Sequence, residues 1–195
     1  RAAGLNFRDV LNVLDMYPGD PGPIGGECAG TVVAVGEGVT ELAVGDEVLA
    51  LVTGCFASYA LADANFVFAK PANLSFAEAA TIPITFLTAY YGLHELAGIR
   101  PDDKVLIHAA SGGVGMAAIQ LCRQVGVEIF GTAGAQAKRA LVKSLGVDHV
   151  HYSRNLDFAD EIMAITGGRG VDIVLNSLAD EFIPKSLEIL ADNGR

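Results

Sequence analysis

Apolar and polar positions alternate in two different ways along this chain, and the second half gives the clearer pattern. Short runs rich in Val, Ile and Leu, which predict buried strands, alternate there with longer segments that predict helices. We expect strands at residues 104–109, 127–132, 148–151 and 171–176, and helices at residues 113–124, 135–145, 156–166 and 180–190. This strict alternation predicts an α/β domain with a parallel sheet.

The first half has a different pattern of apolar residues, with short runs and no alternating helices. Short β-like runs at residues 30–38, 46–54 and 57–71 are separated by glycine turns, which predicts a partly closed β domain. Ser75 and Glu78 form an S-x-x-E capping box that should begin a helix. Pro83 is expected to break or bend the helix that continues beyond it. We therefore predict two domains, residues 1–82 and residues 83–195.

The run that begins at Lys104 ends in a glycine-rich turn, KVLIHAASGGVG, and a helix of small residues follows at once. Backbone N–H groups at such a turn lie at the positive end of the helix dipole, where a pyrophosphate binds. The predicted cofactor-binding residues of this turn are Ser111, Gly112, Gly113, Val114 and Gly115. Ala110 stands where the first glycine of G-x-G-x-x-G is expected. The next apolar run begins twelve residues after Gly115, which leaves room for a crossover helix. The turn therefore predicts dinucleotide binding, and the alternative is a tight strand-to-helix turn that binds nothing.

The acid that holds the adenosine ribose of NAD, about 20 residues beyond such a turn, is missing. No Asp or Glu occurs between Glu128 and Asp148, whereas Lys138 and Arg139 lie in this interval and Arg154 follows the third strand. A carboxylate would repel a 2′-phosphate, and these three bases would neutralise it. The pattern favours NADP(H), and the alternative is that Lys138 and Arg139 are solvated on an exposed helix face.

Charge and cysteine content narrow the class of protein. The net charge is −10 with no basic run, which argues against nucleic acid or an anionic membrane as a partner. No apolar span reaches membrane length and no signal peptide is evident, so we expect a cytoplasmic protein. The three cysteines are scattered singly, which makes structural zinc improbable and suits small core residues in a reducing compartment.

The predicted sheet has four strands, two fewer than the order 3-2-1-4-5-6 requires. The chain ends at Arg195 where a fifth strand is expected, and it begins at Arg1 without an initiator methionine. These observations lead us to expect a truncated fragment with an incomplete sheet, inactive on its own.

Several blocks of sequence resemble one family: AAGLNFRDVLN, MYPG, GGECAGTVVAVGEGV, FLTAYYGL, HAASGGVGMAAIQL, TGGRGVDIVLNSLADEF and LADNGR. The chain is similar to the enoylreductase domains of modular polyketide synthases and animal-type fatty acid synthases, a zinc-free branch of the medium-chain dehydrogenase/reductases. The resemblance implies a GroES-like, partly closed β-barrel domain followed by an incomplete Rossmann doubly wound parallel sheet. Asp15 stands where the family has glycine, which should affect only the local loop.

The resemblance also implies a reaction, the NADPH-dependent reduction of a trans-2-enoyl thioester bound to an acyl carrier protein, with neighbouring megasynthase domains as partners. Hydride adds to the β-carbon and a proton adds to the α-carbon. Tyr17 of the MYPG block is the implied proton donor. Asn6 and Thr88 are implied contacts of the ribose or the nicotinamide amide, and Asn176 lies at the carboxyl end of the fourth strand, where ligands bind. The alternatives are that Tyr17 only packs its loop and that the other three are turn or cap residues.

Zinc-dependent relatives hold their metal with a cysteine in the segment matching LNFRD and a histidine beside the glutamate of G-H-E. Here Gly26 replaces the histidine, and Cys28 alone cannot form a three-ligand site, so no metal is predicted. His94, His108, His149 and His151 show no catalytic spacing, and we assign them no chemistry. Two other functions remain open: a free-standing NADPH-dependent quinone or enone reductase, and a nucleotide-binding module without turnover.

Overall fold

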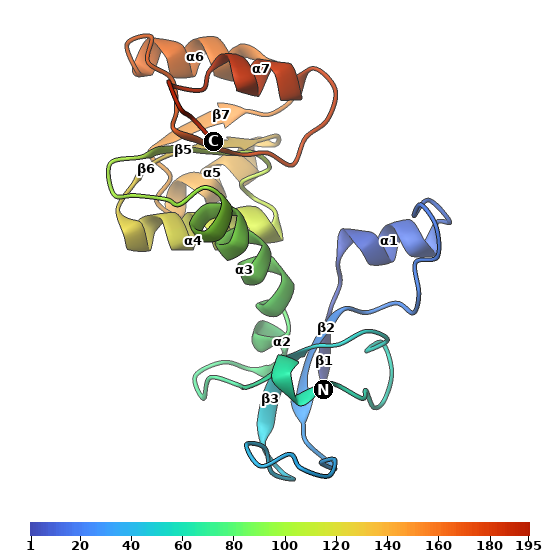
Figure 1. The fold of residues 1–195 in the computed structure, drawn as a ribbon. Coiled ribbons are helices and arrows are strands. Elements are labelled where there is room, and N and C mark those ends of the chain that lie inside the picture. The colour runs from blue at the N-terminus through green and yellow to red at the C-terminus, as the bar shows by residue number, and fades with distance from the viewer. The chain divides into compact units, whose positions relative to one another are not determined.

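The computed structural model describes all 195 residues and divides them into two compact units, Arg1–Thr85 and Phe86–Arg195 (Figure 1). Each unit has its own sheet and its own buried apolar clusters. None of the helices combines the length and the apolar character needed to cross a membrane.

An antiparallel sheet forms the centre of the first unit. Its strands follow the chain order: β1 (Ala2–Gly4), β2 (Glu27–Thr31), β3 (Glu47–Leu51) and β4 (Val67–Ala69). The register pairs Ala29 of β2 with Leu49 of β3, and both side chains are buried against Ala79 and Ala80. Three short helical segments complete the unit: α1 (Phe7–Val13), η1 (Ala64–Phe66) and α2 (Phe76–Ala79). The antiparallel sheet agrees with the GroES-like class expected from the sequence.

Two of the three β-like runs predicted in this unit are wrong over most of their length. Only the first two residues of the run 30–38 belong to a strand, and the run 57–71 is a strand only at 67–69. Val33 and Val35 are exposed, so their apolar character does not reflect burial on a sheet. An alternating pattern fits a strand, but a strand also needs a neighbour to pair with, and local sequence does not report that neighbour.

The capping box is confirmed. The Oγ of Ser75 accepts a hydrogen bond from the N–H of Glu78 at 3.2 Å, and Glu78 Oε2 accepts one from the N–H of Ser75 at 2.8 Å. Helix α2 ends at Ala79, and Pro83 begins the new helix α3 (Pro83–Tyr90), a position that suits proline because its missing N–H is not needed there. Helix α3 continues as a π-helical segment, η2 (Tyr91–Leu96), which the sequence pattern did not predict.

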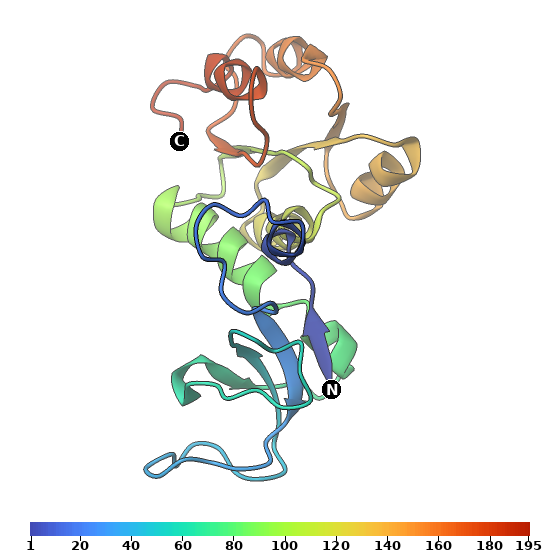
Figure 2. The same ribbon diagram turned by 90° about the vertical axis from the view of Figure 1, so that its right-hand side faces the viewer.

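The second unit contains all eight strands and helices predicted for it, with ends shifted by at most three residues. The parallel strands are β5 (Lys104–Ile107), β6 (Glu128–Ala133), β7 (His149–Tyr152) and β8 (Ile173–Leu175), in the order β7-β6-β5-β8. The helices between and after them are α4 (Gly113–Val125), α5 (Gln136–Ser144), α6 (Asp157–Ile165) and α7 (Phe182–Glu188). Helices α4 and α5 bury apolar residues on one face of the sheet, whereas α6 and α7 cover the other (Figures 1 and 2). This is the doubly wound arrangement.

Two buried carboxylates organise the first unit. Glu27 is 2% exposed, and its two oxygens accept hydrogen bonds from Asn6 Nδ2 and from the N–H of Ile84, each at 2.8 Å. Asp9 accepts from the N–H of Asn6 at 2.9 Å and from the N–H of Gly25 at 2.7 Å. These two side chains therefore tie the start of α1 to β2, to the loop before β2 and to the start of α3.

Replacing Glu27 with Gln should destabilise the first unit. Glutamine offers one acceptor oxygen and one NH₂ group, so either Asn6 or Ile84 would face a donor and lose its buried partner. We expect the free energy of unfolding to fall by about 2 kcal/mol, measured by urea denaturation. Glu37→Gln, at an exposed glutamate in a loop, is the matched control and should change little. Equal stability of the two variants would contradict this account of Glu27.

Candidate cofactor-binding site

The turn between β5 and α4 leaves three backbone donors free at the helix N-terminus. Gly112 is the N-cap residue with extended backbone, φ −83° and ψ 170°. Its carbonyl accepts the first helical hydrogen bond from Met116 at 2.8 Å, while its own N–H donates to the carbonyl of Ala109 at 2.8 Å. The N–H groups of Gly113–Gly115 therefore have no acceptor within the helix. Gly112, predicted as a fourth donor, instead stabilises the turn.

Gly115 allows α4 to approach the end of β5 very closely. A Cβ atom placed on it would lie 2.6 Å from the carbonyl oxygen of Ala109 and 2.6 Å from the Cα of Ala110. These are backbone atoms that cannot move aside, so only glycine fits. Ala110 replaces the expected first glycine without loss, because its methyl group is fully buried against the bare backbone of Gly131. The departure from G-x-G-x-x-G therefore leaves the turn intact.

A basic group, defined as Lys138, Arg139 and Arg154, follows the carboxyl ends of β6 and β7. The guanidinium of Arg139 lies 5.1 Å from the centre of the Tyr152 ring and donates to the carbonyl of Gly134. Arg154 lies over the same glycine, since a Cβ atom on Gly134 would be 3.2 Å from Arg154 Nε. Lys138 is exposed. None of the three forms a salt bridge.

These features fit a phosphorylated dinucleotide. Three unpaired N–H groups at a helix N-terminus suit a pyrophosphate, and a close helix-to-strand approach keeps them together. The basic group lies at the edge of the sheet where open α/β sheets bind ligands, and Arg139 and Arg154 meet there around Gly134. The guanidinium fork matches the geometry of a phosphate monoester.

Tyr17 and Asn6, the predicted reaction-site residues of the first unit, have defined neighbours. The Tyr17 ring is half-buried, and the guanidinium carbon of Arg8 lies 5.2 Å from its centre. Arg8 also donates to the carbonyl of Pro21 at 2.6 Å, which fixes it beside the loop. Asn6 uses its amide nitrogen on Glu27. Asp15, where the family has glycine, adopts the left-handed conformation with φ 56°, a conformation that glycine adopts more readily.

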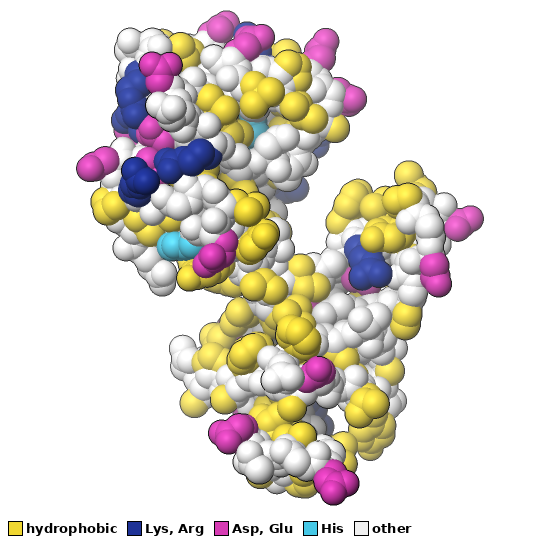
Figure 3. All heavy atoms as spheres, viewed as in Figure 1, with side chains coloured by type: hydrophobic (Ala, Val, Ile, Leu, Met, Phe, Trp, Pro, Cys, Tyr) yellow, Lys and Arg dark blue, Asp and Glu magenta, His cyan; other side chains and the backbone are white.

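Helix α1 and the loop after it also expose several apolar side chains (Figure 3). They are Phe7, Val10, Val13, Leu14 and Met16. This surface borders Tyr17 along the sequence.

Three predicted contact residues in the second unit make different use of their side chains. Thr88 is exposed on α3, and Ser111 is half-buried in the glycine-rich turn. Asn176 follows β8, and its side chain bonds twice to Leu178: Oδ1 accepts from the N–H and Nδ2 donates to the carbonyl, each at 3.0 Å. Asn176 therefore stabilises a local turn, the alternative raised from sequence, and ligand contacts by these three residues stay predictions.

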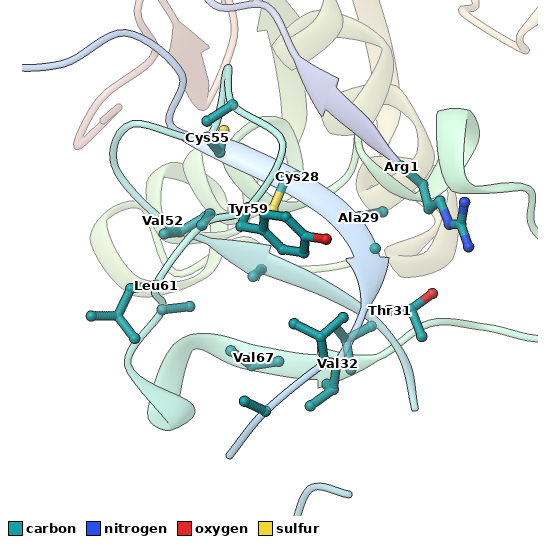
Figure 4. Close-up of a pocket in the computed structure, with 18 of the residues that line it drawn as sticks. Arg1, Cys28, Ala29, Thr31, Val32, Val52, Cys55, Tyr59, Leu61 and Val67 are labelled. Carbon is teal, nitrogen blue, oxygen red and sulfur yellow. The ribbon is translucent and has the colours of Figure 1, made fainter. Parts of the chain in front are cut away.

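A groove of the first unit, about 940 Å³ in volume, is lined mainly by apolar residues (Figure 4). Cys28 and Cys55 both contribute to its wall. Burial raises the pKa of both thiols above the ordinary value, so both are protonated at neutral pH. Nowhere in the structure do three His, Cys, Asp or Glu side chains gather closely enough to hold a metal ion.

His108, to which we assigned no chemistry from its sequence context, is the buried polar centre of the second unit. Its Nδ1 lies 3.0 Å from Thr132 Oγ1 and its Nε2 lies 2.9 Å from Ser186 Oγ. Ser186 donates its hydroxyl hydrogen to the carbonyl of Phe182 at 2.6 Å, so it accepts from His108 Nε2–H. Nδ1 is then unprotonated and accepts from Thr132. The available signal was a polar residue at the end of an otherwise apolar strand, immediately before the turn.

An antiparallel domain followed by a doubly wound sheet with a glycine-rich turn defines the class of two-domain, nicotinamide-dependent oxidoreductases. Comparison with known families agrees with this class. Residues 1–83 match the family model of the alcohol dehydrogenase GroES-like domain, and residues 113–195 match that of zinc-binding dehydrogenases.

The chain is 50% identical over its whole length to the pikromycin polyketide synthase component PikAII of Streptomyces venezuelae, of which it spans 5%. It superposes on the crystal structure of CurK enoyl reductase with a TM-score of 0.95 and 49% identity, covering 99% of this chain and 61% of that one. A mycobacterial protein complexed with NADPH matches with a TM-score of 0.90 and 33% identity, over 97% of this chain and 60% of that one. The chain belongs to the medium-chain dehydrogenase/reductase superfamily, in the branch of polyketide synthase enoylreductase domains.

Stability should depend on pH through His108. Burial lowers its pKa to about 4 from 6.5, so between these values the unfolded chain binds a proton that the folded chain excludes. The stabilising contribution is therefore complete above about pH 6.5 and is lost as pH falls towards 4. Urea unfolding at about pH 7 and about pH 4.5 should show a loss of roughly 2 to 3 kcal/mol that is absent in His108→Gln. An equal loss of unfolding free energy in the unaltered protein and in His108→Gln would contradict the conclusion that the imidazole is buried and neutral.

Proposed function

We propose that the chain belongs to an NADPH-dependent enoylreductase that reduces a trans-2-enoyl thioester bound to an acyl carrier protein, alongside neighbouring domains of a synthase. The observation that carries this proposal is the pairing of an intact dinucleotide turn with an unpaired basic group, in a chain about half identical to polyketide synthase enoylreductases. The NADPH complex of a related protein supports the choice of cofactor.

The N–H groups of Gly113–Gly115 would hold the pyrophosphate, and the basic group would hold the 2′-phosphate. When bound, NADPH supplies the hydride that the β-carbon of the substrate accepts. An acidic residue after β6 would favour NAD, because it would bind the free 2′-hydroxyl of the adenosine ribose. No such residue is present here, which suits NADP(H).

Tyr17 would complete the reduction. Addition of hydride at the β-carbon moves the electron pair of the C=C bond towards the thioester oxygen and leaves an enolate. The phenol O–H of Tyr17 then breaks, and its proton forms the new bond at the α-carbon. The phenolate that remains is negative, and the guanidinium of Arg8, 5.2 Å from the ring centre, stabilises it.

The side chains at the positions where related dehydrogenases hold zinc are committed to the fold. Both oxygens of Asp9 bind backbone amides, and both oxygens of Glu27 bind Asn6 and Ile84. Gly26 offers no ligand atom. The proposed reaction therefore uses no metal-assisted step.

Steady-state assays separate this function from its alternatives. The enoylreductase to which this chain belongs should oxidise NADPH with a crotonyl thioester and act more efficiently when a carrier protein bears the acyl group. Turnover with soluble quinones but not with thioesters would favour a quinone reductase. NADPH binding without turnover of any acceptor would favour a nucleotide-binding module.

Arg154→Ala should weaken NADPH binding while leaving NADH binding unchanged, because it removes a contact to the 2′-phosphate only. We expect the dissociation constant for NADPH to rise about 10- to 100-fold. Lys138→Ala should give a smaller rise, because an ammonium group binds a phosphate as a point charge and lacks the bidentate fork of the guanidinium. Lys143→Ala, also exposed and also on α5, is the control. Equal losses for both dinucleotides would refute the phosphate role.

Tyr17→Phe should leave the affinity for NADPH intact and affect only protonation. With an α-methyl-enoyl thioester we expect slower turnover, by up to about 10²-fold or more, or a product of altered α-configuration. Chiral chromatography of the product gives the sharper measurement, since water can replace a lost donor. Wild-type rate together with wild-type configuration would show that Tyr17 only packs its loop.

A further inference from the structure

Ala109, the residue between His108 and the glycine-rich turn, is held in an unfavourable conformation. Its φ is +47°, in the left-handed region that costs a non-glycine residue of order 1 kcal/mol. Thr132 on the neighbouring strand contacts both of its flanks. The Thr132 carbonyl accepts from the N–H of Ala110 at 2.9 Å, and the Thr132 hydroxyl donates to the ring of His108. One residue therefore fixes the chain immediately before and immediately after Ala109.

The position of Ala109 in turn sets the first turn of α4. Its carbonyl accepts from the N–H of Gly112 at 2.8 Å and lies 2.6 Å from where a Cβ of Gly115 would be. A change in the backbone of Ala109 would move this carbonyl against the helix. The N–H groups of Gly113–Gly115 would then lose their common orientation.

We propose that His108 is a positioning residue for the cofactor. Clamped between Thr132 of β6 and Ser186 of α7, its imidazole keeps Ala109 left-handed and so keeps the free N–H groups of α4 aligned for a pyrophosphate. This inference rests on the proposed dinucleotide binding at the turn and adds the residues that maintain it.

The clamp needs a neutral ring with its proton on Nε2. The hydroxyl of Ser186 donates its only hydrogen to the carbonyl of Phe182, so Ser186 can only accept a hydrogen bond from His108, and Nε2 must carry the ring proton. The hydrogen bond donated by the Thr132 hydroxyl then requires an unprotonated Nδ1. The ring is 3% exposed and meets the edge of Phe158 at 5.0 Å, an apolar setting that favours the neutral form. The same network thus stays in place at neutral pH.

The test compares Thr132→Val with Thr132→Ser. Valine keeps the shape of threonine but removes the hydroxyl, which leaves His108 Nδ1 unpaired, whereas serine retains the donor. Thr132→Val should raise the dissociation constants of NADPH and NADH by the same factor, about 5- to 30-fold, since both carry the pyrophosphate. Thr132→Ser should restore binding to within about 2-fold of wild type. Thr166→Val removes a hydroxyl at the end of α6 that donates to the carbonyl of Ile162 at 2.8 Å and accepts from the N–H of Gly170 at 2.9 Å. Because this hydroxyl has no contact with His108 or the turn, the variant should leave both dissociation constants unchanged.

The outcomes are distinct. A Thr132→Val protein with a lower melting temperature but wild-type dissociation constants would overturn the proposal, because the network would then be structural only. A rise in the dissociation constant of NADPH alone would also overturn the proposal, since the substitution would then act on the 2′-phosphate and not on the pyrophosphate. If Thr132→Val does not fold, Ser186→Ala removes the other side of the clamp and should again weaken both dinucleotides equally. Absence of dinucleotide binding by the unaltered protein would overturn the proposed function itself, and this inference with it.

Discussion

The second unit depends on the close approach of α4 to the end of β5 at Gly115. A helix that begins so near a strand brings its free N–H groups together at one point, at the positive end of the helix dipole. No side chain fits between Gly115 and the backbone of Ala109 and Ala110, so the approach is fixed by steric exclusion. Three other features of the turn accompany this approach: the left-handed Ala109, the small Ala110 and the bare Gly131 against which Ala110 packs.

The first unit uses its two buried carboxylates to hold its own fold together. Asp9 and Glu27 lie in the two segments that hold zinc ligands in related dehydrogenases, yet each binds two donors of its own domain. Buried carboxylates are costly unless each oxygen is satisfied, and here four donors satisfy four oxygens. These carboxylates are therefore structural residues, and the reaction that we propose assigns its chemistry to other side chains, Tyr17 and Arg8.

The sequence predicted the second unit well because its elements are long, strongly periodic and separated by glycine turns. It failed at residues 32–36 and 57–62, where apolar residues alternate but no partner strand is present. The π-helical segment Tyr91–Leu96 also has no local signature. His108 was missed for a related reason: its partners Thr132 and Ser186 lie 24 and 78 residues away, and only the fold brings them together. By contrast, the side chain of Asn176 bonds to the backbone of Leu178, only two residues away. Asparagine commonly forms such turns, so residue type alone was enough to raise this alternative.

The distribution of ion pairs is one electrostatic argument for a phosphorylated ligand. Four bases of the second unit are paired with carboxylates: Lys104 with Glu128, Arg169 with Asp172, Lys185 with Glu188 and Arg195 with Asp103. Arg123 and Lys143 form no ion pair, but each donates to a backbone carbonyl, and Arg100 is an exposed base without a carboxylate partner. In a chain with a net charge of −10, carboxylates are plentiful, yet none lies beside the basic group. Arg139 and Arg154 both lie at Gly134, and like charges placed so close repel one another because solvent screens them only over about 8 to 10 Å. A bound phosphate would remove that repulsion, so the charge at this edge of the sheet agrees with the 2′-phosphate contact that we propose.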